Sequence, residues 1–261
     1  MVRPFWSRGW EVFPYDQPIA DWVAHALPLA QQAASDPAHR QWLDCEGTWF
    51  IGVDALPNDG AGRVGASAPL SGQAVAFLVE HYESIKLHKG QVSVVYPGYP
   101  RPRRGENEAA ARYRAKRDAA HVDGLKPGGP DRRRKIDETH AWVLGIPLTQ
   151  ASADAAPLVV WDGSHKIMGA AFKAALAGVP RTRWAQTDIT EAYQAARREV
   201  FETCPRIEVS ASPGETYVLH RHCLHGVAPW GAGATAGPDG RMIAYFRPEL
   251  PGGVAEWIES P

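Results

Sequence analysis

Short runs of β-forming residues recur through the chain, and they constrain its fold more than any other feature. Each run is apolar or alternating in polarity, and turn-forming residues separate it from the next. The runs lie at residues 91–96, 141–148, 158–161, 206–209, 216–219, 223–227 and 242–247. Glycine and proline are plentiful, with 25 and 22 residues, which favours many short elements over a helical bundle. The pattern predicts a mainly β fold with flanking helices (α+β), built on a double-stranded β-helix core of the jelly-roll, cupin-like type.

Helical signals precede and interrupt these runs. Helices are predicted at residues 16–32, after Ser71, at 106–120, near 166–177 and near 188–201. Pro28 is expected to kink or break the first helix, and Ser71 is expected to cap the second. We therefore predict one domain over residues 1–261, with a mainly helical flank at 1–90 and a jelly-roll core with inserted helices at 91–261.

The bulk properties exclude several classes of protein. The formal net charge of −1 gives no reason to expect nucleic acid or an anionic membrane as a partner. Three scattered cysteines are too few for a disulfide framework. Neither the apolar core of a signal peptide nor a membrane-length apolar run is present in the sequence. These properties predict a cytoplasmic protein that acts on a small molecule, and they do not determine its oligomeric state.

Two segments about a hundred residues apart carry the chemical signal. The first is His121-Val122-Asp123, and the second is the histidine-rich stretch from Leu219 to Gly226 that contains His225. A His-x-Asp step and one distant histidine form the facial triad that holds non-haem Fe(II) and leaves coordination positions open. Residues i and i+2 of an extended segment point to the same side, so His121 and Asp123 can bind one metal ion, and Gly124 lets the chain turn directly afterwards.

The second segment offers several candidates for the third ligand. His220, His222, His225 and, more weakly, Cys223 are available. We favour His225, because the following Gly226 permits close backbone packing near a metal. Cys223 is interpreted as a small buried hydrophobe, since a thiolate would be atypical for this ligand set.

A cationic strand follows at the C-terminal end. Residues 241–247 alternate in polarity and place Arg241 and Arg247 on one face. The planar fork of an arginine binds a carboxylate in bidentate fashion, and a 2-oxo acid cosubstrate would need such a partner for its far carboxylate. We prefer Arg241, which begins the strand expected to pair with the one that carries His225, and keep Arg247 as the second candidate.

Four segments together resemble the phytanoyl-CoA dioxygenase family of Fe(II)/2-oxoglutarate oxygenases. They are His121-Val122-Asp123, the turn Gly163-Ser164-His165, the stretch from Pro213 to Gly226, and Arg241. In that family an acidic residue follows a glycine and the metal-binding histidine lies ten residues further on, as Glu215 and His225 do here. The resemblance extends from about residue 90 to the C-terminus, and the N-terminal helices match loosely.

The resemblance implies Fe(II) on His121, Asp123 and His225, and 2-oxoglutarate bound by Arg241. It also implies that O₂ is used to hydroxylate or otherwise oxidise a C–H bond of a small organic substrate, with release of succinate and CO₂. It does not identify the substrate, because the family is broad. Asp123 leaves no vacant position for a halide, which argues against a halogenase. Ser164 could contact substrate or cosubstrate, or it could simply cap the following helix.

Some features keep alternatives open. The basic residues of segments 101–117 and 132–135 are either solvated faces or a site for an anionic substrate. His140, Trp142, Trp161 and Trp230 are expected to be core residues rather than pocket walls. Two other functions also use such a fold: a non-catalytic small-molecule binder with a vestigial metal site, and a hydrolase or isomerase that uses a divalent metal as a Lewis acid.

Overall fold

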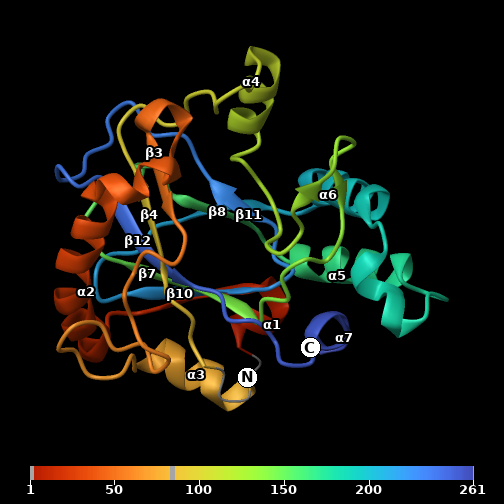
Figure 1. Cartoon of the computed structure of the whole chain (residues 1–261), viewed down its shortest axis with the longest axis horizontal. Helices are drawn as coiled ribbons and strands as arrows, with labels where there is room; N and C mark the ends of the chain where they lie inside the picture. Colours follow the sequence, from red (N-terminus) through yellow and green to blue (C-terminus); the bar gives the residue numbers. More distant parts are fainter. Residues whose placement is uncertain (1–2, 83–85, 261) are drawn as a thin grey trace.

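The computed structural model describes residues 3–82 and 86–260, and two antiparallel sheets form its centre (Figure 1). Within these residues the larger sheet has the order β1-β10-β7-β12-β4-β3-β2, and the smaller one β11-β8-β9. Strands β1 to β4 span Trp10–Phe13, Leu43–Asp44, Trp49–Gly52 and Gln91–Val95. Strands β7 to β12 span Trp142–Pro147, Leu158–Trp161, Arg206–Val209, Thr216–His220, His225–Val227 and Arg241–Phe246. From β9 onward successive strands alternate between the sheets, with β9 and β11 in the smaller one and β10 and β12 in the larger one, as in a double-stranded β-helix. The predicted fold class is therefore confirmed.

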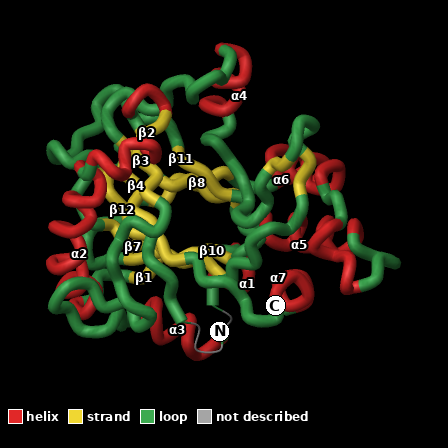
Figure 2. Tube along the Cα trace, viewed as in Figure 1, coloured by secondary structure: helices red, strands yellow, loops and turns green. Residues whose placement is uncertain are grey.

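Helices surround the sheets (Figures 1 and 2). They are α1 (Pro4–Arg8), α2 (Gln17–Ser35), α3 (Gln73–His81), α4 (Glu108–Lys116), α5 (Ser164–Ala175), α6 (Thr190–Thr203) and α7 (Gly253–Glu259). Short 3₁₀ turns span Pro37–Trp42, Cys45–Gly47 and Arg181–Gln186. In the part of the chain that the structure describes, none of the helices combines the length and apolarity that a bilayer crossing requires.

Two apolar layers hold the fold together. Helix α2 buries Ile19, Trp22 and Ala26 against the larger sheet, and Pro28 lies inside this helix without ending it. The second layer fills the space between the two sheets and includes Leu158 and Ile243. Strand β4 is buried along its whole length because α2 covers one side and the interior of the β-helix the other.

Several elements differ from the sequence-based expectations. The N-terminal flank also supplies strands, since β1 pairs with β10 and β3 pairs with β4 at the sheet ends. Gly72, not Ser71, precedes α3 at its N-terminus, and the Asp16 carboxylate accepts a hydrogen bond from the Gln73 N–H that begins this helix, at 2.6 Å. Helix α4 is shorter than predicted because Asn107 caps it by accepting a hydrogen bond from the Ala110 N–H. The predicted basic loop contains a two-stranded ribbon, β5 (Pro127–Gly128) with β6 (Arg133–Arg134).

Candidate metal centre and its cavities

The three predicted ligands converge at one end of the β-helix. His225 is the first residue of β11, and its backbone exchanges two hydrogen bonds with that of His121, at 2.8 and 3.0 Å. The Oδ1 atom of Asp123 lies 3.3 Å from His121 Nε2 and 3.8 Å from His225 Nε2. One ligand atom from each of the three residues lies within 4.8 Å of the others, the spacing that a shared metal ion requires.

Backbone carbonyls orient both imidazole rings. His121 Nδ1 lies 3.0 Å from the Ala119 carbonyl, and His225 Nδ1 lies 2.9 Å from the Cys223 carbonyl. Each Nδ1–H donates to its carbonyl, which leaves the Nε2 lone pairs directed at Asp123. A hydrogen-bond acceptor behind the ring is the usual support of a metal-ligating histidine. The histidines are therefore held in the tautomer and orientation that metal binding needs.

The local electrostatics keep Asp123 charged and His225 neutral. Burial opposes ionisation of Asp123, but Arg247 and the two imidazoles outweigh it and hold its pKa well below the usual range. Arg247 Nη1 lies 3.3 Å from Asp123 Oδ2. Burial lowers the pKa of His225 to about 4, so its ring is neutral near pH 7. A carboxylate and neutral imidazoles are the protonation states in which these groups bind metals.

Two glycines allow the backbone to pack closely around the triad. Gly124 has φ +81°, and a Cβ there would lie 2.0 Å from the Glu138 carbonyl oxygen. A Cβ on Gly226 would lie 2.0 Å from the Asp118 carbonyl oxygen. Both glycines therefore have the roles predicted for them: Gly124 turns the chain after Asp123, and Gly226 brings β11 against the segment that carries His121.

The donor set fits the facial triad. Two imidazoles and one carboxylate come from one side of a common point, and this combination is diagnostic of non-haem iron sites with open positions. His121 and Asp123 also face two cavities, so the remaining positions of a bound ion would be accessible to ligands. Residues His121, Asp123 and His225 could thus hold a metal ion and present it to small molecules.

The inner of these two cavities lies between the sheets and has a volume of about 140 Å³. His121, Asp123 and His225 line it at one end, together with Trp49 and Arg247. Polar groups on the larger sheet, Gln91, Ser93 and Tyr245, also line it, and the remaining wall is formed by apolar side chains that include Val143 and Leu158. Arg247 donates to Gln91 Oε1 at 2.5 Å, and its Nε is buried without a partner among the described residues.

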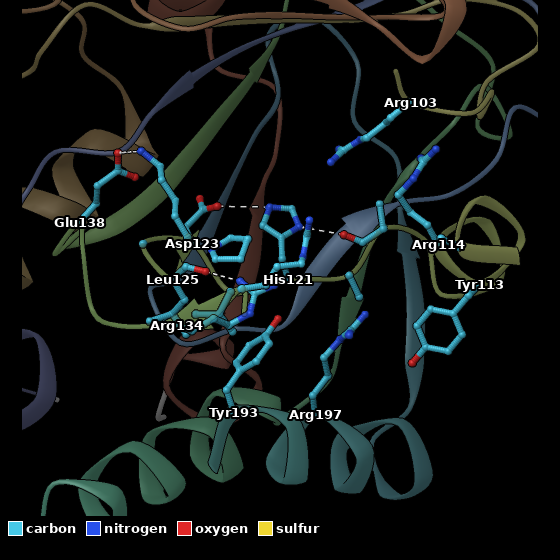
Figure 3. Close-up of a pocket in the computed structure, with 18 of the residues that line it drawn as sticks. Arg103, Tyr113, Arg114, His121, Asp123, Leu125, Arg134, Glu138, Tyr193 and Arg197 are labelled. Atoms are coloured by element: carbon cyan, nitrogen blue, oxygen red, sulfur yellow. Dashed lines mark hydrogen bonds and ion pairs between the residues drawn. The ribbon is translucent and has the colours of Figure 1, made fainter. Parts of the chain in front are cut away.

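The outer cavity has a volume of about 480 Å³ and opens on the other side of the triad. Figure 3 shows Arg134, Tyr193 and Arg197 on one wall and Arg103 and Arg114 on another, around His121. Tyr193 and Arg197 project from α6, and Arg114 from α4. Trp49, His121, Asp123 and Arg247 line both cavities, which therefore adjoin at the triad.

The expected position of Arg241 is wrong. Strand β12 pairs with β4 and β7 in the larger sheet, whereas His225 lies on β11 in the smaller sheet. Arg241 therefore does not begin a strand beside His225, and it lines a separate small cavity that includes Tyr217 and Ile243. Arg247, the second candidate, is the arginine that contacts Asp123, because the chain reaches the metal end of the β-helix only after β12.

Ser164 has a structural contact and does not line either triad cavity. It is the first residue of α5, with Gly163 in the cap position, so it is not the helix cap. Its hydroxyl accepts a hydrogen bond from the Leu224 N–H at 3.0 Å and lies 3.7 Å from Cys223 Sγ. Ser164 thereby fixes the segment that leads into His225. Cys223 is fully buried, and burial raises the pKa of its thiol to about 12, in agreement with its interpretation as a small hydrophobe.

The remaining candidates divide between core and cavity. His140 is buried; its Nδ1–H donates to the Arg247 carbonyl at 2.7 Å, and its Nε2 lies 3.2 Å from Glu138 Oε2. It therefore positions Arg247 and does not line either triad cavity. Trp142 and Trp161 belong to the core. Sequence reasoning did not single out Trp49, Tyr193 or Arg197, because each comes from an element whose place over the metal end depends on the tertiary fold.

Comparisons with known proteins support the fold. Neither protein-family models nor curated protein sequences match the chain. Among solved structures, EctD from S. alaskensis with bound Fe is 18% identical, with a TM-score of 0.51, over 94% of this chain and 73% of that one. SnoK, a non-heme alpha ketoglutarate dependent carbocyclase from nogalamycin biosynthesis, is 12% identical, with a TM-score of 0.48, over 97% of this chain and 86% of that one. HygX from Streptomyces hygroscopicus, with nickel, 2-oxoglutarate and hygromycin B bound, is 14% identical, with a TM-score of 0.44, over 94% of this chain and 85% of that one. At these identities the similarity to EctD concerns the fold alone.

Proposed function

We propose that this protein is an Fe(II)- and 2-oxoglutarate-dependent oxygenase that oxidises a C–H bond of a small organic substrate. The observation that carries the proposal is the convergence of His121 Nε2, His225 Nε2 and an Asp123 oxygen where two cavities meet. The motifs that resemble the phytanoyl-CoA dioxygenase family support the same assignment. A cavity of about 480 Å³ is in the range that small-molecule sites occupy.

The reaction is an oxidation of two molecules by one O₂. 2-Oxoglutarate, O₂ and a substrate R–H give succinate, CO₂ and R–OH, so one oxygen atom enters succinate and the other the product. Iron, when bound, supplies the O₂ activation and the oxidising power for this step. His121, Asp123 and His225 would hold it, and the two cavities that adjoin these residues would give small molecules access to it.

We assign the inner cavity to 2-oxoglutarate. Its arginine, Arg247, has an unpartnered buried Nε, and its Nη1 contacts Asp123. An arginine fork binds a carboxylate strongly where water is excluded, and Ser93 and Tyr245 add hydroxyl groups on the same side. Arg241 lies beside a different cavity, although Tyr217, which it faces, hydrogen-bonds Tyr245 at 2.8 Å. The geometry therefore favours Arg247 over Arg241 as the partner of the cosubstrate.

Succinate formation tests the function directly. The protein is incubated with Fe(II), 2-oxoglutarate and O₂, and succinate is measured with and without each component. We expect slow, iron-dependent succinate formation even without the true substrate, and a loss of at least about a hundredfold in His225→Ala, since substitutions outside the ligand shell already cost 10–100-fold. Activity that persists without O₂ would instead indicate a redox-neutral metal enzyme. Metal binding with no turnover under any condition would indicate a binding protein.

Paired arginine variants test the cosubstrate assignment. Arg247→Gln is expected to raise the KM for 2-oxoglutarate by roughly tenfold or more, because at least one charged hydrogen bond is lost. Arg241→Gln is the matched control, since it removes the same charge at the first residue of β12, whereas Arg247 directly follows the last residue of this strand. Fe(II) affinity is measured separately for both variants, because Arg247 also contacts Asp123. A large KM increase in Arg241→Gln alone would show that the sequence-based choice was correct and the geometric one was not.

A further inference from the structure

The outer cavity carries more positive charge than the protein as a whole. Its lining includes seven cationic side chains, namely Arg103, Arg114, Lys126, Arg132, Arg134, Arg197 and Arg247, against three carboxylates, namely Glu106, Asp123 and Glu138. The complete chain has a formal net charge of −1. A local excess of cations on a nearly neutral protein needs a physical reason, because like charges repel when they are gathered in one cavity.

Carboxylates form ion pairs with the cations that line the outer cavity away from α6 and β6. Arg114 Nη2 lies 2.8 Å from Glu106 Oε2, and Arg103 Nε lies 3.4 Å from Asp44 Oδ2. Lys126, on another part of the rim, pairs with Glu138. These ion pairs partly compensate the charge beside α4, although Arg103 Nε and Arg114 Nη1 make no hydrogen bond to the described residues.

The wall formed by α6 and β6 has no such compensation. Arg134 uses its guanidinium to donate to the Leu125 carbonyl and to stack on the Tyr193 ring, 4.8 Å from its centroid. Arg197 lies 5.0 Å above the Phe201 ring, and its Nε is buried without a hydrogen-bond partner. Among the residues that the structure describes, no carboxylate forms an ion pair with Arg132, Arg134 or Arg197.

These arginines are close enough to influence one another. Burial lowers the pKa of Arg134, and the positive charges of Arg197 and Arg132 lower it further, against the effect of Tyr193. Figure 3 shows Arg134 and Arg197 on either side of Tyr193, all on the side of the cavity that faces His121. Two stacked guanidinium groups held in fixed positions are suited to bind a tetrahedral oxyanion with several hydrogen bonds.

We propose that the substrate carries a phosphate group, which binds to Arg134 and Arg197 at the α6 wall of the outer cavity. The rest of the substrate extends from this wall toward His121, so that the anion fixes its position while its reacting C–H bond lies near the metal centre. Binding energy from a remote group can position a reacting bond in this way. That the bound phosphate belongs to a substrate rests on the proposed function. Whether the site binds phosphate at all can be tested without any reaction.

Binding of inorganic phosphate to the full-length, metal-free protein is the direct test. Metal is left out because phosphate would also bind to open positions on an ion. Titration calorimetry at constant ionic strength is expected to show saturable binding to wild type. Arg197→Gln is expected to weaken it roughly tenfold or more, the effect of one lost hydrogen bond between charged groups. Arg197→Lys is expected to retain part of the affinity, because it keeps the charge but loses the fork.

Arg198→Gln is the matched control, because it removes the same charge from the next position of α6, where the side chain is exposed and does not line the cavity. It is expected to bind phosphate as wild type does. Equal affinities of Arg197→Gln and Arg198→Gln, or the lack of saturable binding to wild type, would overturn the proposal. Circular dichroism confirms that each variant is folded, and Arg134→Gln provides a second, independent disruption of the site.

Succinate formation separates this proposal from the proposed function. Matched pairs of phosphate monoesters and their parent alcohols are compared as stimulators of iron-dependent turnover. Stimulation by esters alone is expected. Stimulation by the alcohols alone would refute the phosphate site and leave the oxygenase assignment intact. Phosphate binding without any succinate formation would support the anion site and refute the oxygenase assignment.

Discussion

The close approach of two backbone segments behind the triad makes Gly226→Ala the most informative single substitution. A Cβ at this position would lie 2.0 Å from the Asp118 carbonyl oxygen, whereas real Cβ contacts under 3.0 Å essentially never occur. The two segments must therefore separate by at least about 1 Å. The backbone at Asp118 cannot move away easily, because the Arg206 guanidinium donates two hydrogen bonds of 2.7 and 2.8 Å to the Asp118 carboxylate.

The size of the effect follows from what this separation breaks. The Val227 N–H donates to the Asp118 carbonyl at 2.7 Å, and His121 and His225 exchange backbone hydrogen bonds of 2.8 and 3.0 Å. Net stabilisation of roughly 1 kcal/mol for each bond gives a loss of about 1–3 kcal/mol, which agrees with the usual cost of overpacking. A domain of this size then melts roughly 2–10 °C lower.

Metal binding should suffer more than stability. Coordination distances tolerate deviations of only about 0.2 Å, and the substitution moves His225 relative to His121 by several times that amount. We expect Gly226→Ala to lose at least about tenfold in Fe(II) affinity, measured anaerobically by titration calorimetry on folded protein.

Gly237→Ala is the control, since a Cβ at Gly237 meets nothing within 4 Å and the substitution should leave both metal affinity and melting temperature unchanged. Wild-type Fe(II) affinity in Gly226→Ala would refute the reasoning, because it would mean that the contact between β11 and Asp118 does not set the ligand geometry.

Three further predictions concern stability. Burial lowers the pKa of three histidines, to about 4 for His165 and His225 and well below the ordinary value for His222. The unfolded chain binds protons on them below about pH 6.5 while the folded protein does not, so metal-free protein should lose roughly 2 kcal/mol per histidine between pH 7 and pH 5. Equal urea midpoints at the two pH values would contradict this. Ser164→Ala leaves the buried Leu224 N–H without its acceptor and should cost about 1–3 kcal/mol in urea unfolding, with no change in the KM for 2-oxoglutarate. Arg206→Gln leaves the buried Asp118 carboxylate without its cation; because Arg206 is partly exposed, the expected cost is about 1–3 kcal/mol by the same measurement, and a cost in 1 M salt as large as that in low salt would show that charge pairing is not the cause.

The convergence of His121, Asp123 and His225 was predictable because metal-binding chemistry constrains both residue type and spacing. Two ligands on one short extended segment and a third before a glycine can be recognised without knowledge of the tertiary fold. The structure adds that this segment is hardly a strand, since His121 pairs with His225 through a single isolated bridge. Left-handed residues at Asp118 and Ala119 turn the chain sharply just before it. Local spacing was therefore sufficient even though the expected strand is nearly absent from the described residues.

The arginine could not be placed in the same way, because its position depends on which sheet the last strand joins. Sequence order suggests that β12 follows β11 into the same sheet, but β11 lies in the smaller sheet and β12 in the larger one. Arg241 and Arg247 have the same local pattern, so only the fold distinguishes them. Trp49 illustrates the same limit, since β3 reaches the metal end of the barrel by pairing with β4.

The placement of α6 explains why one wall of the outer cavity carries ion-paired cations and the other carries cations without a carboxylate partner among the described residues. Helix α6 lies in the sequence between β8 and β9 of the smaller sheet and packs on α5. One face of α6 therefore lines the outer cavity, although the helix is not part of the β-helix. Tyr193 is buried, and Arg197, one turn later on the same face of the helix, is partly exposed; both line the outer cavity. A change at Arg197 can therefore alter the charge of the mouth without touching the triad or the sheets that position it. Separate elements therefore determine which ligand binds in the outer cavity and how the proposed metal ligands are arranged. We infer that substitutions on the α6 wall change ligand binding and leave the metal site intact, provided that the variant is folded.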